Sequence, residues 1–153
     1  MYQPSGEHRY RVVAWWTSGN CGLAKSESAP NAIHFTTPKE FGGLAGIWTP
    51  EELLLASLGG CFTTTLRTVA GTDKFDITDL EVEVNGTLRK STCGYDFSAI
   101  VIRPKLRIAC SNERERAFNL LRKAERLCLV FRAIDAPLRF EPKIEVIDAV
   151  FSV

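Results

Sequence analysis

The sequence predicts an α+β fold, with a mainly antiparallel sheet and two core helices. Three observations predict it. One long apolar helix is indicated from residue 50, long strands are marked by alternating apolar and polar residues at 77–88 and 97–109, and a second helix follows from residue 112. The order of strands, helix, strands, helix and strand is typical of α+β proteins. A chain of 153 residues suits one core, and we expect a single domain over 1–153.

The first 48 residues predict short strands and a loop. Residues 9–16 are rich in β-branched and aromatic side chains, and the turn at 17–22 favours a hairpin that returns over 23–28. A further short strand is expected at 32–35. Residues 38–48 contain three glycines, which indicates a loop leading into the first helix.

The first helix has a well-specified beginning. Thr49 suits the N-cap, Pro50 suits the first helical position, and Glu52 completes a capping box with Thr49. Beyond it almost every face is apolar, so we expect a helix that is buried all round. Gly59 and Gly60 each cost about 1 kcal/mol relative to alanine in a helix interior. Either another backbone crosses there, or a small molecule reaches Cys61.

Two strands and a second helix complete the prediction. The strands at 77–88 and 97–109 pair most simply as an antiparallel meander, with the second strand broken or placed at an edge by Pro104. The helix begins near Asn112, and Glu115 completes a capping box. Its apolar positions have helical spacing and place Cys128 on the buried face: Ala117, Leu120, Leu121, Ala124, Cys128 and Phe131. A last strand is expected at 143–150.

Composition argues against several classes of protein. With 19 Lys and Arg against 18 Asp and Glu, the chain has no excess charge for nucleic acid or an anionic membrane. The polar N-terminus and an apolar run judged too short to span a bilayer favour a cytoplasmic protein. The two histidines, His8 and His34, lack metal-ligand spacing, so no metal site is expected. Five scattered cysteines without a C-x-x-C pair favour reduced thiols.

Each predicted core helix carries one cysteine, Cys61 or Cys128. Two buried helices in so small a domain are expected to touch, so the thiols either meet as a redox pair or lie separately as small apolar side chains. Cys21, Cys93 and Cys110 fall in predicted turns or at a strand end. We expect those three to be bystanders.

Two segments resemble the osmotically inducible protein C and organic hydroperoxide resistance family, OsmC/Ohr. They are Thr-Pro-Glu-Glu-Leu-Leu-Leu-Ala-Ser-Leu-Gly-Gly-Cys-Phe at 49–62 and Lys-Ala-Glu-Arg-Leu-Cys-Leu-Val-Phe-Arg-Ala-Ile at 123–134. The order of strands and helices, the Trp-bearing first strand and the Gly-Gly loop extend the resemblance over nearly the whole chain.

The resemblance implies an intertwined homodimer with two active sites at its interface, each a thiol peroxidase. Cys61 would attack the distal oxygen of an organic hydroperoxide and become a sulfenic acid, and Cys128 would resolve it to a disulfide. An external dithiol, possibly a lipoyl group on a protein, would then reset the pair, with no metal or flavin. The apolar side chains Leu54, Leu58, Phe62 and Phe131 suggest a bulky organic hydroperoxide rather than hydrogen peroxide.

Glu51 matches the glutamate that the family places after the proline at the start of the helix. Ten helical residues separate Glu51 from Cys61 by about 15 Å, so the two cannot meet within one helix. Glu51 therefore serves the site from the partner chain or through an intermediary. Alternatively, it is a first-turn acid that complements the helix dipole.

The sequence departs from the family pattern around both cysteines. The arginine expected in the turn after the first strand is absent, and Arg9, Arg11, Lys39 and Arg132 are the candidate replacements. Leu129 stands where a proline usually follows the second cysteine. Without a nearby cation, a buried Cys61 would keep a raised pKa. The alternative function is therefore a hydrophobic-ligand or interaction module in which both thiols are merely buried.

Overall fold

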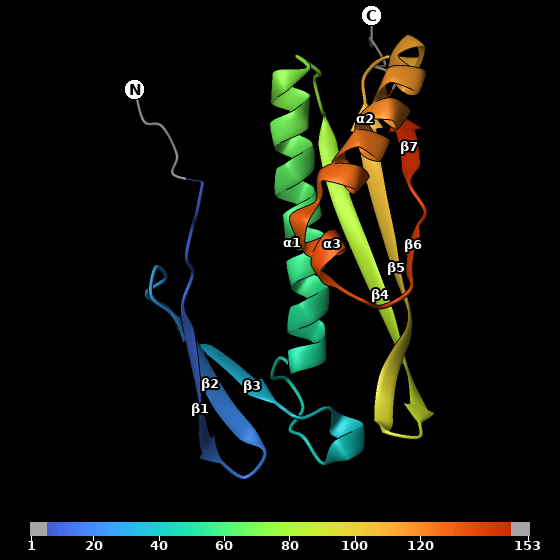
Figure 1. The fold of residues 1–153 in the computed structure, drawn as a ribbon. Coiled ribbons are helices and arrows are strands. Elements are labelled where there is room, and N and C mark those ends of the chain that lie inside the picture. Colours follow the sequence, from blue (N-terminus) through green and yellow to red (C-terminus); the bar gives the residue numbers. More distant parts are fainter. Residues whose placement is uncertain (1–5, 148–153) are drawn as a thin grey trace, which may run out of the picture. The chain divides into compact units, whose positions relative to one another are not determined.

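A computed structural model describes residues 6–147, and the chain divides into two compact units after Leu54. The division falls inside α1 (Pro50–Thr72), the longest helix (Figure 1). The fold is mixed α+β with sheets that are largely antiparallel, as predicted. That the whole chain is one domain stays a prediction.

The first unit contains a three-stranded antiparallel sheet in the order β1-β2-β3. Its strands are β1 (Val12–Ser18), β2 (Cys21–Ser26) and β3 (Ile33–Thr36), which confirms the predicted hairpin and the short strand after it. Gly19 has a φ of 53°, a left-handed conformation that suits glycine in the tight β1–β2 turn. A 3₁₀ turn at Lys39–Phe41 interrupts the loop that leads to α1.

The predicted capping box at the start of α1 is confirmed. The Thr49 N–H donates to the Glu52 carboxylate at 2.9 Å, and the Glu52 N–H donates to the Thr49 hydroxyl at 3.1 Å. These reciprocal bonds satisfy two backbone donors, one at the cap itself and one in the first turn of the helix.

The prediction that α1 is buried all round is wrong for the single chain. Only one stripe of the helix is buried, formed by Leu58, Phe62, Leu66, Val69 and Ala70. By length and composition alone α1 could cross a membrane, with a mean hydropathy of 1.3 over 18 residues, so the expectation that the apolar run is too short is also wrong. Core helices of soluble proteins pass the same test, and 33% of the apolar window of α1 is buried within the chain.

The second unit is built on β4 (Asp79–Ser91) and β5 (Gly94–Ile108), a long antiparallel pair. The short strands β6 (Leu138–Phe140) and β7 (Lys143–Val146) run parallel to β5 on its other side. The sequence did not predict β6. Of the predicted last strand, 143–150, residues 148–150 lie outside the described part of the chain.

Pro104 neither breaks β5 nor places it at an edge, so that prediction is wrong. Pro104 pairs with Val82 of β4 in the middle of a continuous strand. On the other side, β6 pairs with residues 100–102 and β7 with residues 105–108. The break between β6 and β7 therefore lies beside Pro104, where the missing N–H removes no bond of either parallel ladder.

The second helix differs from its prediction at both ends. Residues Ser111–Glu113 form a 3₁₀ turn, so α2 (Arg114–Leu127) begins later than Asn112 and has no side-chain cap, and the capping box with Glu115 does not form. The helix stops at Leu127 because Cys128 is extended, with φ −65° and ψ 111°. The short helix α3 (Leu129–Ala133) then begins. The predicted buried face of α2 is confirmed: Ala117, Leu120, Leu121 and Ala124.

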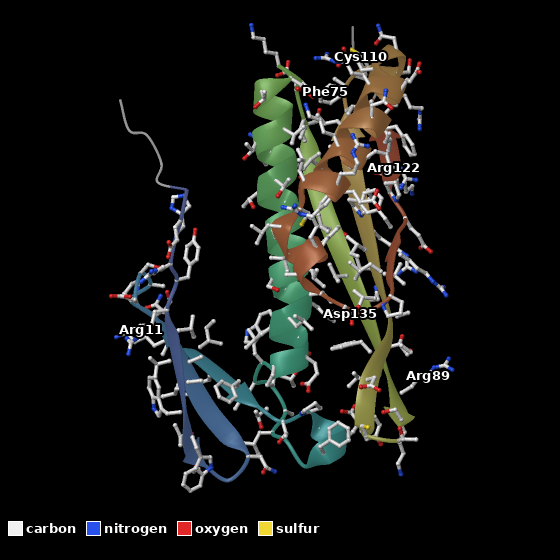
Figure 2. All side chains as sticks on the ribbon, viewed as in Figure 1. Arg11, Phe75, Arg89, Cys110, Arg122 and Asp135 are labelled. Atoms are coloured by element: carbon white, nitrogen blue, oxygen red, sulfur yellow. The ribbon has the colours of Figure 1, made fainter. Side chains whose placement is uncertain are left out.

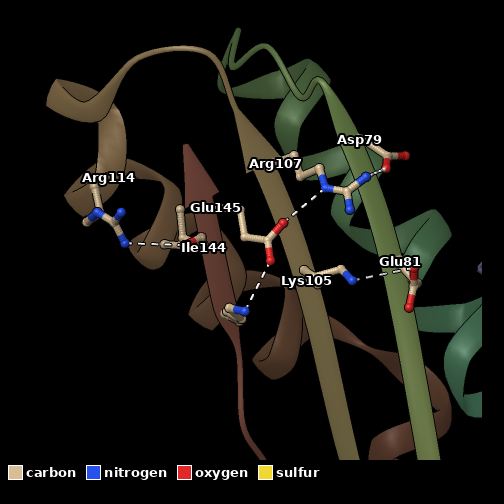
Figure 3. Close-up of polar contacts among 8 residues, drawn as sticks. Asp79, Glu81, Lys105, Arg107, Arg114, Ile144 and Glu145 are labelled. Atoms are coloured by element: carbon tan, nitrogen blue, oxygen red, sulfur yellow. Dashed lines mark hydrogen bonds and ion pairs between the residues drawn. The ribbon is translucent and has the colours of Figure 1, made fainter. Parts of the chain in front are cut away.

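The two faces of the second sheet differ in character. One face carries the buried side chains of β5, which pack with the buried stripes of α1 and α2 in one core: Ile100, Ile102, Leu106 and Ile108. The opposite face carries ion pairs, with Arg107 bound to Asp79 at 2.8 Å and to Glu145 at 3.1 Å (Figure 3). The helices thus cover only the apolar face, and both Cys61 and Cys128 lie on that side.

Candidate functional site

The structure brings the thiols of Cys61 and Cys128 into hydrogen-bond contact. Cys61 lies in the middle of α1, and Cys128 lies at the break between α2 and α3. The Cys128 thiol donates to the Cys61 sulfur. Both cysteines are free; Cys61 is half-buried, and Cys128 is fully buried. Of the two alternatives that the sequence left open, the structure favours thiols that meet, while the roles of both cysteines stay predictions.

The other three cysteines occupy separate places. Cys21 opens β2 and its thiol lies 3.7 Å from the Thr36 hydroxyl. Cys93 is exposed in the turn between β4 and β5, and Cys110 is exposed just after β5 (Figure 2). That these three are bystanders stays a prediction.

Four hydrogen bonds act on the Cys61 sulfur. Burial by itself raises the pKa of Cys61, but the Val130 N–H, the Cys128 thiol, the Thr65 hydroxyl and the Leu129 N–H all donate to the sulfur and lower it. The net pKa of Cys61 lies below its ordinary value, because donors favour the charged acceptor.

Cys128 is shifted in the opposite direction. Burial raises the pKa of Cys128 to about 11, although the Phe131 N–H donates to its sulfur and lowers it. Donating its own proton to Cys61, and facing the negative charge of that thiolate, raise it further. As the pH rises, the first proton therefore leaves Cys61, and Cys128 keeps its proton to a higher pH.

Within residues 6–147, the groups that lower the pKa of Cys61 are four uncharged donors. Of the candidate replacements for the expected arginine, Arg132 instead lines a pocket of about 440 Å³ with Arg122, Phe131 and Phe140. Arg9 pairs with Glu7 at 2.7 Å in the first unit. Whether Arg9, Arg11 or Lys39 serves Cys61 stays a prediction. Among residues 6–147 no group of three His, Cys, Asp or Glu side chains is placed to hold a metal ion.

Sequence analysis missed the uncharged donors that lower the pKa of Cys61. The extended Cys128 turns the chain so that the N–H groups of Leu129 and Val130, at the start of α3, donate to Cys61. A proline at position 129 has no N–H to donate, so the departure from the family pattern supplies a hydrogen bond. Thr65 follows Cys61 by four residues, and that helical spacing was a signal available in the sequence.

The two glycines before Cys61 have different surroundings. A Cβ on Gly59 would lie 3.3 Å from a methyl group of Val84, so β4 passes close to α1 there. This agrees with the first of the two expectations, that another backbone crosses at the glycines. Gly60 faces open space in the described part of the chain.

The apolar lining expected for the substrate is placed differently. Leu58 and Phe62 are fully buried in the core, and the Phe62 ring stacks on Phe131 at 5.8 Å between centroids. These side chains support the helices behind the thiols and do not form an open lining. This expectation was therefore wrong for Leu58 and Phe62.

Glu51 lies in the first turn of α1, ten residues before Cys61 on the same helix. The helical rise separates them by about 15 Å. One carboxylate oxygen of Glu51 is buried and has no hydrogen-bond partner within residues 6–147. A buried oxygen without a partner is uncommon in folded proteins. Its role at the site stays a prediction.

Comparison with known proteins gives one family. Residues 43–143 match the model of the OsmC-like protein family. YmaD, an uncharacterized protein of Bacillus subtilis, is 24% identical over 88% of this chain and 92% of its own length. An OsmC-like protein of unknown function from Vibrio cholerae superposes with a TM-score of 0.78 at 12% identity, covering 89% of this chain and 99% of that one.

An organic hydroperoxide resistance protein, OsmC of Legionella pneumophila, superposes with a TM-score of 0.72 at 23% identity, covering 92% of this chain and 100% of that one. At these identities the solved structures establish the fold, and the family model, which spans most of the chain, establishes the membership. The chain therefore belongs to the OsmC-like family, whose solved structures include organic hydroperoxide resistance proteins.

Proposed function

We propose that this protein is a thiol peroxidase that reduces organic hydroperoxides to alcohols. The observation that carries the proposal is the Cys61–Cys128 pair, in which hydrogen bonds lower the pKa of one sulfur while burial raises that of the other to about 11. A two-cysteine peroxidase needs one thiolate that attacks and one thiol that waits. The family membership supports the same chemistry.

The proposed reaction has two steps at sulfur. The Cys61 thiolate attacks the distal oxygen of the hydroperoxide; an S–O bond forms, the O–O bond breaks, and the alkoxide takes a proton from solvent water and leaves as the alcohol. The Cys128 sulfur then attacks the resulting sulfenic acid, so that an S–S bond forms, the S–O bond breaks, and water leaves with the remaining proton. The contact between the two sulfurs allows the second step without a large movement.

An external dithiol completes the proposed cycle by reducing the Cys61–Cys128 disulfide through thiol–disulfide exchange. We propose a protein-bound lipoyl group for this step, with no metal or flavin. A reducing cytoplasm is the compartment that would keep the five free cysteines in the reduced form.

We further propose that the protein works as an intertwined homodimer. The first unit exposes large apolar side chains over its small sheet, and every residue of β1 is exposed: Val12, Val13, Trp15 and Trp16 are 65%, 41%, 42% and 74% accessible. An apolar surface of this kind marks an interface. Because α1 also buries only one stripe, a second copy is the partner that would cover both features.

Unpaired strand edges support the same proposal. Within residues 6–147, β1 lies at one edge of its sheet and the 13-residue β4 at one edge of the other. Long free edges invite pairing with another chain. In such a dimer, the orphaned carboxylate oxygen of Glu51 would find its partner at the site of the second copy.

One observation favours the alternative function, a hydrophobic-ligand binding module. The 440 Å³ pocket combines the apolar side chains of Ile102, Phe131, Leu138 and Phe140 with three arginines. Apolar pockets with a few polar groups bind small molecules. Neither Cys61 nor Cys128 is among the residues that line this pocket. The redox experiment below decides between the two functions.

The first prediction concerns the disulfide. One equivalent of cumene hydroperoxide, added to the reduced protein, should produce a Cys61–Cys128 disulfide within seconds, because the sulfurs are already in contact. Non-reducing peptide mass mapping after thiol blocking measures it. The Cys61→Ser variant should form no such disulfide, and Cys128→Ser should accumulate the Cys61 sulfenic acid. If both thiols stay alkylatable, or oxidise no faster than Cys93, the binding module becomes the better reading.

The second prediction concerns the Leu129 N–H. Leu129→Pro should raise the pKa of Cys61 and slow its reaction with peroxide at neutral pH by about tenfold, because one donor to the thiolate is lost. Proline suits this position, the first residue of α3. Leu129→Ala keeps the N–H and should react like the wild type. Equal rates for the proline and alanine variants would show that this N–H does not support the thiolate.

The third prediction concerns Glu51 and the dimer. The protein should elute with the mass of two chains, and Glu51→Gln and Cys61→Ser should each lose most of their activity. Co-refolding the two variants should restore about a quarter of the wild-type activity, because half of the dimers are mixed and each has one intact site. Absence of complementation would place Glu51 in its own chain's site or outside the site.

A further inference from the structure

The pocket of about 440 Å³ is formed by α2, α3 and the strands β5 and β6, all within the second unit. Its lining has an apolar part and a charged part. The charged part consists of three arginines and one glutamate, and the apolar part consists of Ile102, Phe131, Leu138 and Phe140. Ligand pockets of proteins commonly measure about 300–1,000 Å³ and combine apolar walls with a few polar groups.

Contacts with the core hold the apolar part in place. The rings of Phe131 and Phe140 both lie against the buried ring of Phe62, with centroids 5.8 Å and 5.5 Å away. Ile102 is fully buried and pairs with Phe140 in the parallel ladder of β5 and β6. A ligand would therefore gain apolar contacts here without first ordering a loop.

The guanidinium of Arg122, on α2, is also held by its neighbours (Figure 2). Its Cζ atom lies 5.1 Å from the centroid of the Phe118 ring and 5.4 Å from that of the Phe140 ring. Its Nη1 donates to the Glu125 carboxylate at 3.0 Å. A guanidinium carries five N–H donors, so most of them remain for a ligand. Because the group is already oriented, it loses little freedom when it binds an anion.

The charges of the pocket do not balance. Glu125 is bound to Arg122, whereas Arg126 and Arg132 have no side-chain ion pair within residues 6–147. Two positive charges of the lining are thus uncompensated. Arg126 follows Arg122 by four residues, so these two like charges share one face of α2 and repel each other. An anion bound between the arginines would relieve that repulsion.

We propose that this pocket binds a small amphipathic anion, namely a carboxylate that carries an apolar chain. The arginines bind the carboxylate, because a guanidinium matches its two oxygens. The chain lies against the apolar part of the pocket. Arg132 thereby has a role in ligand binding. The proposal goes beyond peroxide reduction and does not depend on it, because neither Cys61 nor Cys128 lines the pocket.

The test titrates the reduced protein with octanoate and follows its amide NMR signals. Acetate carries the charge without the chain, and octanol carries the chain without the charge. Octanoate should bind at least about tenfold more tightly than either, because only octanoate uses both parts of the pocket. The largest signal changes should fall on residues 122–132 and 138–140.

Variants of the arginines without an ion pair test the charged part. The double variant Arg126→Gln with Arg132→Gln should weaken octanoate binding by about tenfold and leave octanol binding unchanged. Arg139→Gln is the matched control. Arg139 lies between Leu138 and Phe140 on β6, so its side chain points to the opposite face, and it does not line the pocket. This control should bind octanoate like the wild type.

Three results would overturn the proposal. They are octanoate that binds no more tightly than octanol, a double variant that keeps the wild-type affinity, and an Arg139→Gln variant that weakens binding equally. Signal changes centred on the exposed strand β1 would also overturn it, because octanoate would then bind that apolar surface instead.

The titration involves no peroxide, so it is independent of the proposed function. A wild type that binds octanoate in the pocket but does not reduce cumene hydroperoxide would overturn only the peroxidase. A wild type that reduces the peroxide but does not bind octanoate would overturn only the anion site.

Discussion

The asymmetry of the cysteine pair depends on the uncharged hydrogen-bond donors around one half-buried sulfur, that of Cys61. Burial alone would keep the proton on Cys61. Donors from three places outweigh it: the thiol of Cys128, a hydroxyl of α1 and two N–H groups at the start of α3. The same arrangement leaves Cys128 protonated, which gives the pair its asymmetry. Hydrogen bonds weaken steeply as the distance between donor and acceptor grows, so the site needs accurate placement of α3 against α1.

The fold provides that placement. The sheet packs its apolar face against the stripes of α1 and α2, and its other face is covered by cross-strand ion pairs. Phe62, next to Cys61, stacks on Phe131 of α3 and lies 5.5 Å from the ring of Phe140 on β6. These rings join the nucleophile's helix to the helix that supplies the N–H donors.

Features encoded by neighbouring residues were predictable from the sequence. The capping box of Thr49 and Glu52, the helical face of α2 and the alternation of β4 each depend on local spacing. The end of α2 was not predictable, because the run from Leu127 to Phe131 continues an apolar helical pattern while the chain is extended at Cys128. Pro104 was misjudged because its tolerance depends on a gap between two distant strands.

The central claim is that uncharged donors lower the pKa of Cys61 below its ordinary value, whereas the pKa of Cys128 is raised. The most direct test is the pH dependence of iodoacetamide alkylation in the wild-type protein, resolved for Cys61 and Cys128 by peptide mass spectrometry. Since only the thiolate reacts, each rate rises with pH through the pKa of its own thiol. The account predicts that Cys61 reacts at a pH below that of an ordinary cysteine, while Cys128 reacts only as the pH approaches about 11. A Cys61 that ionises with or after Cys128 would contradict it.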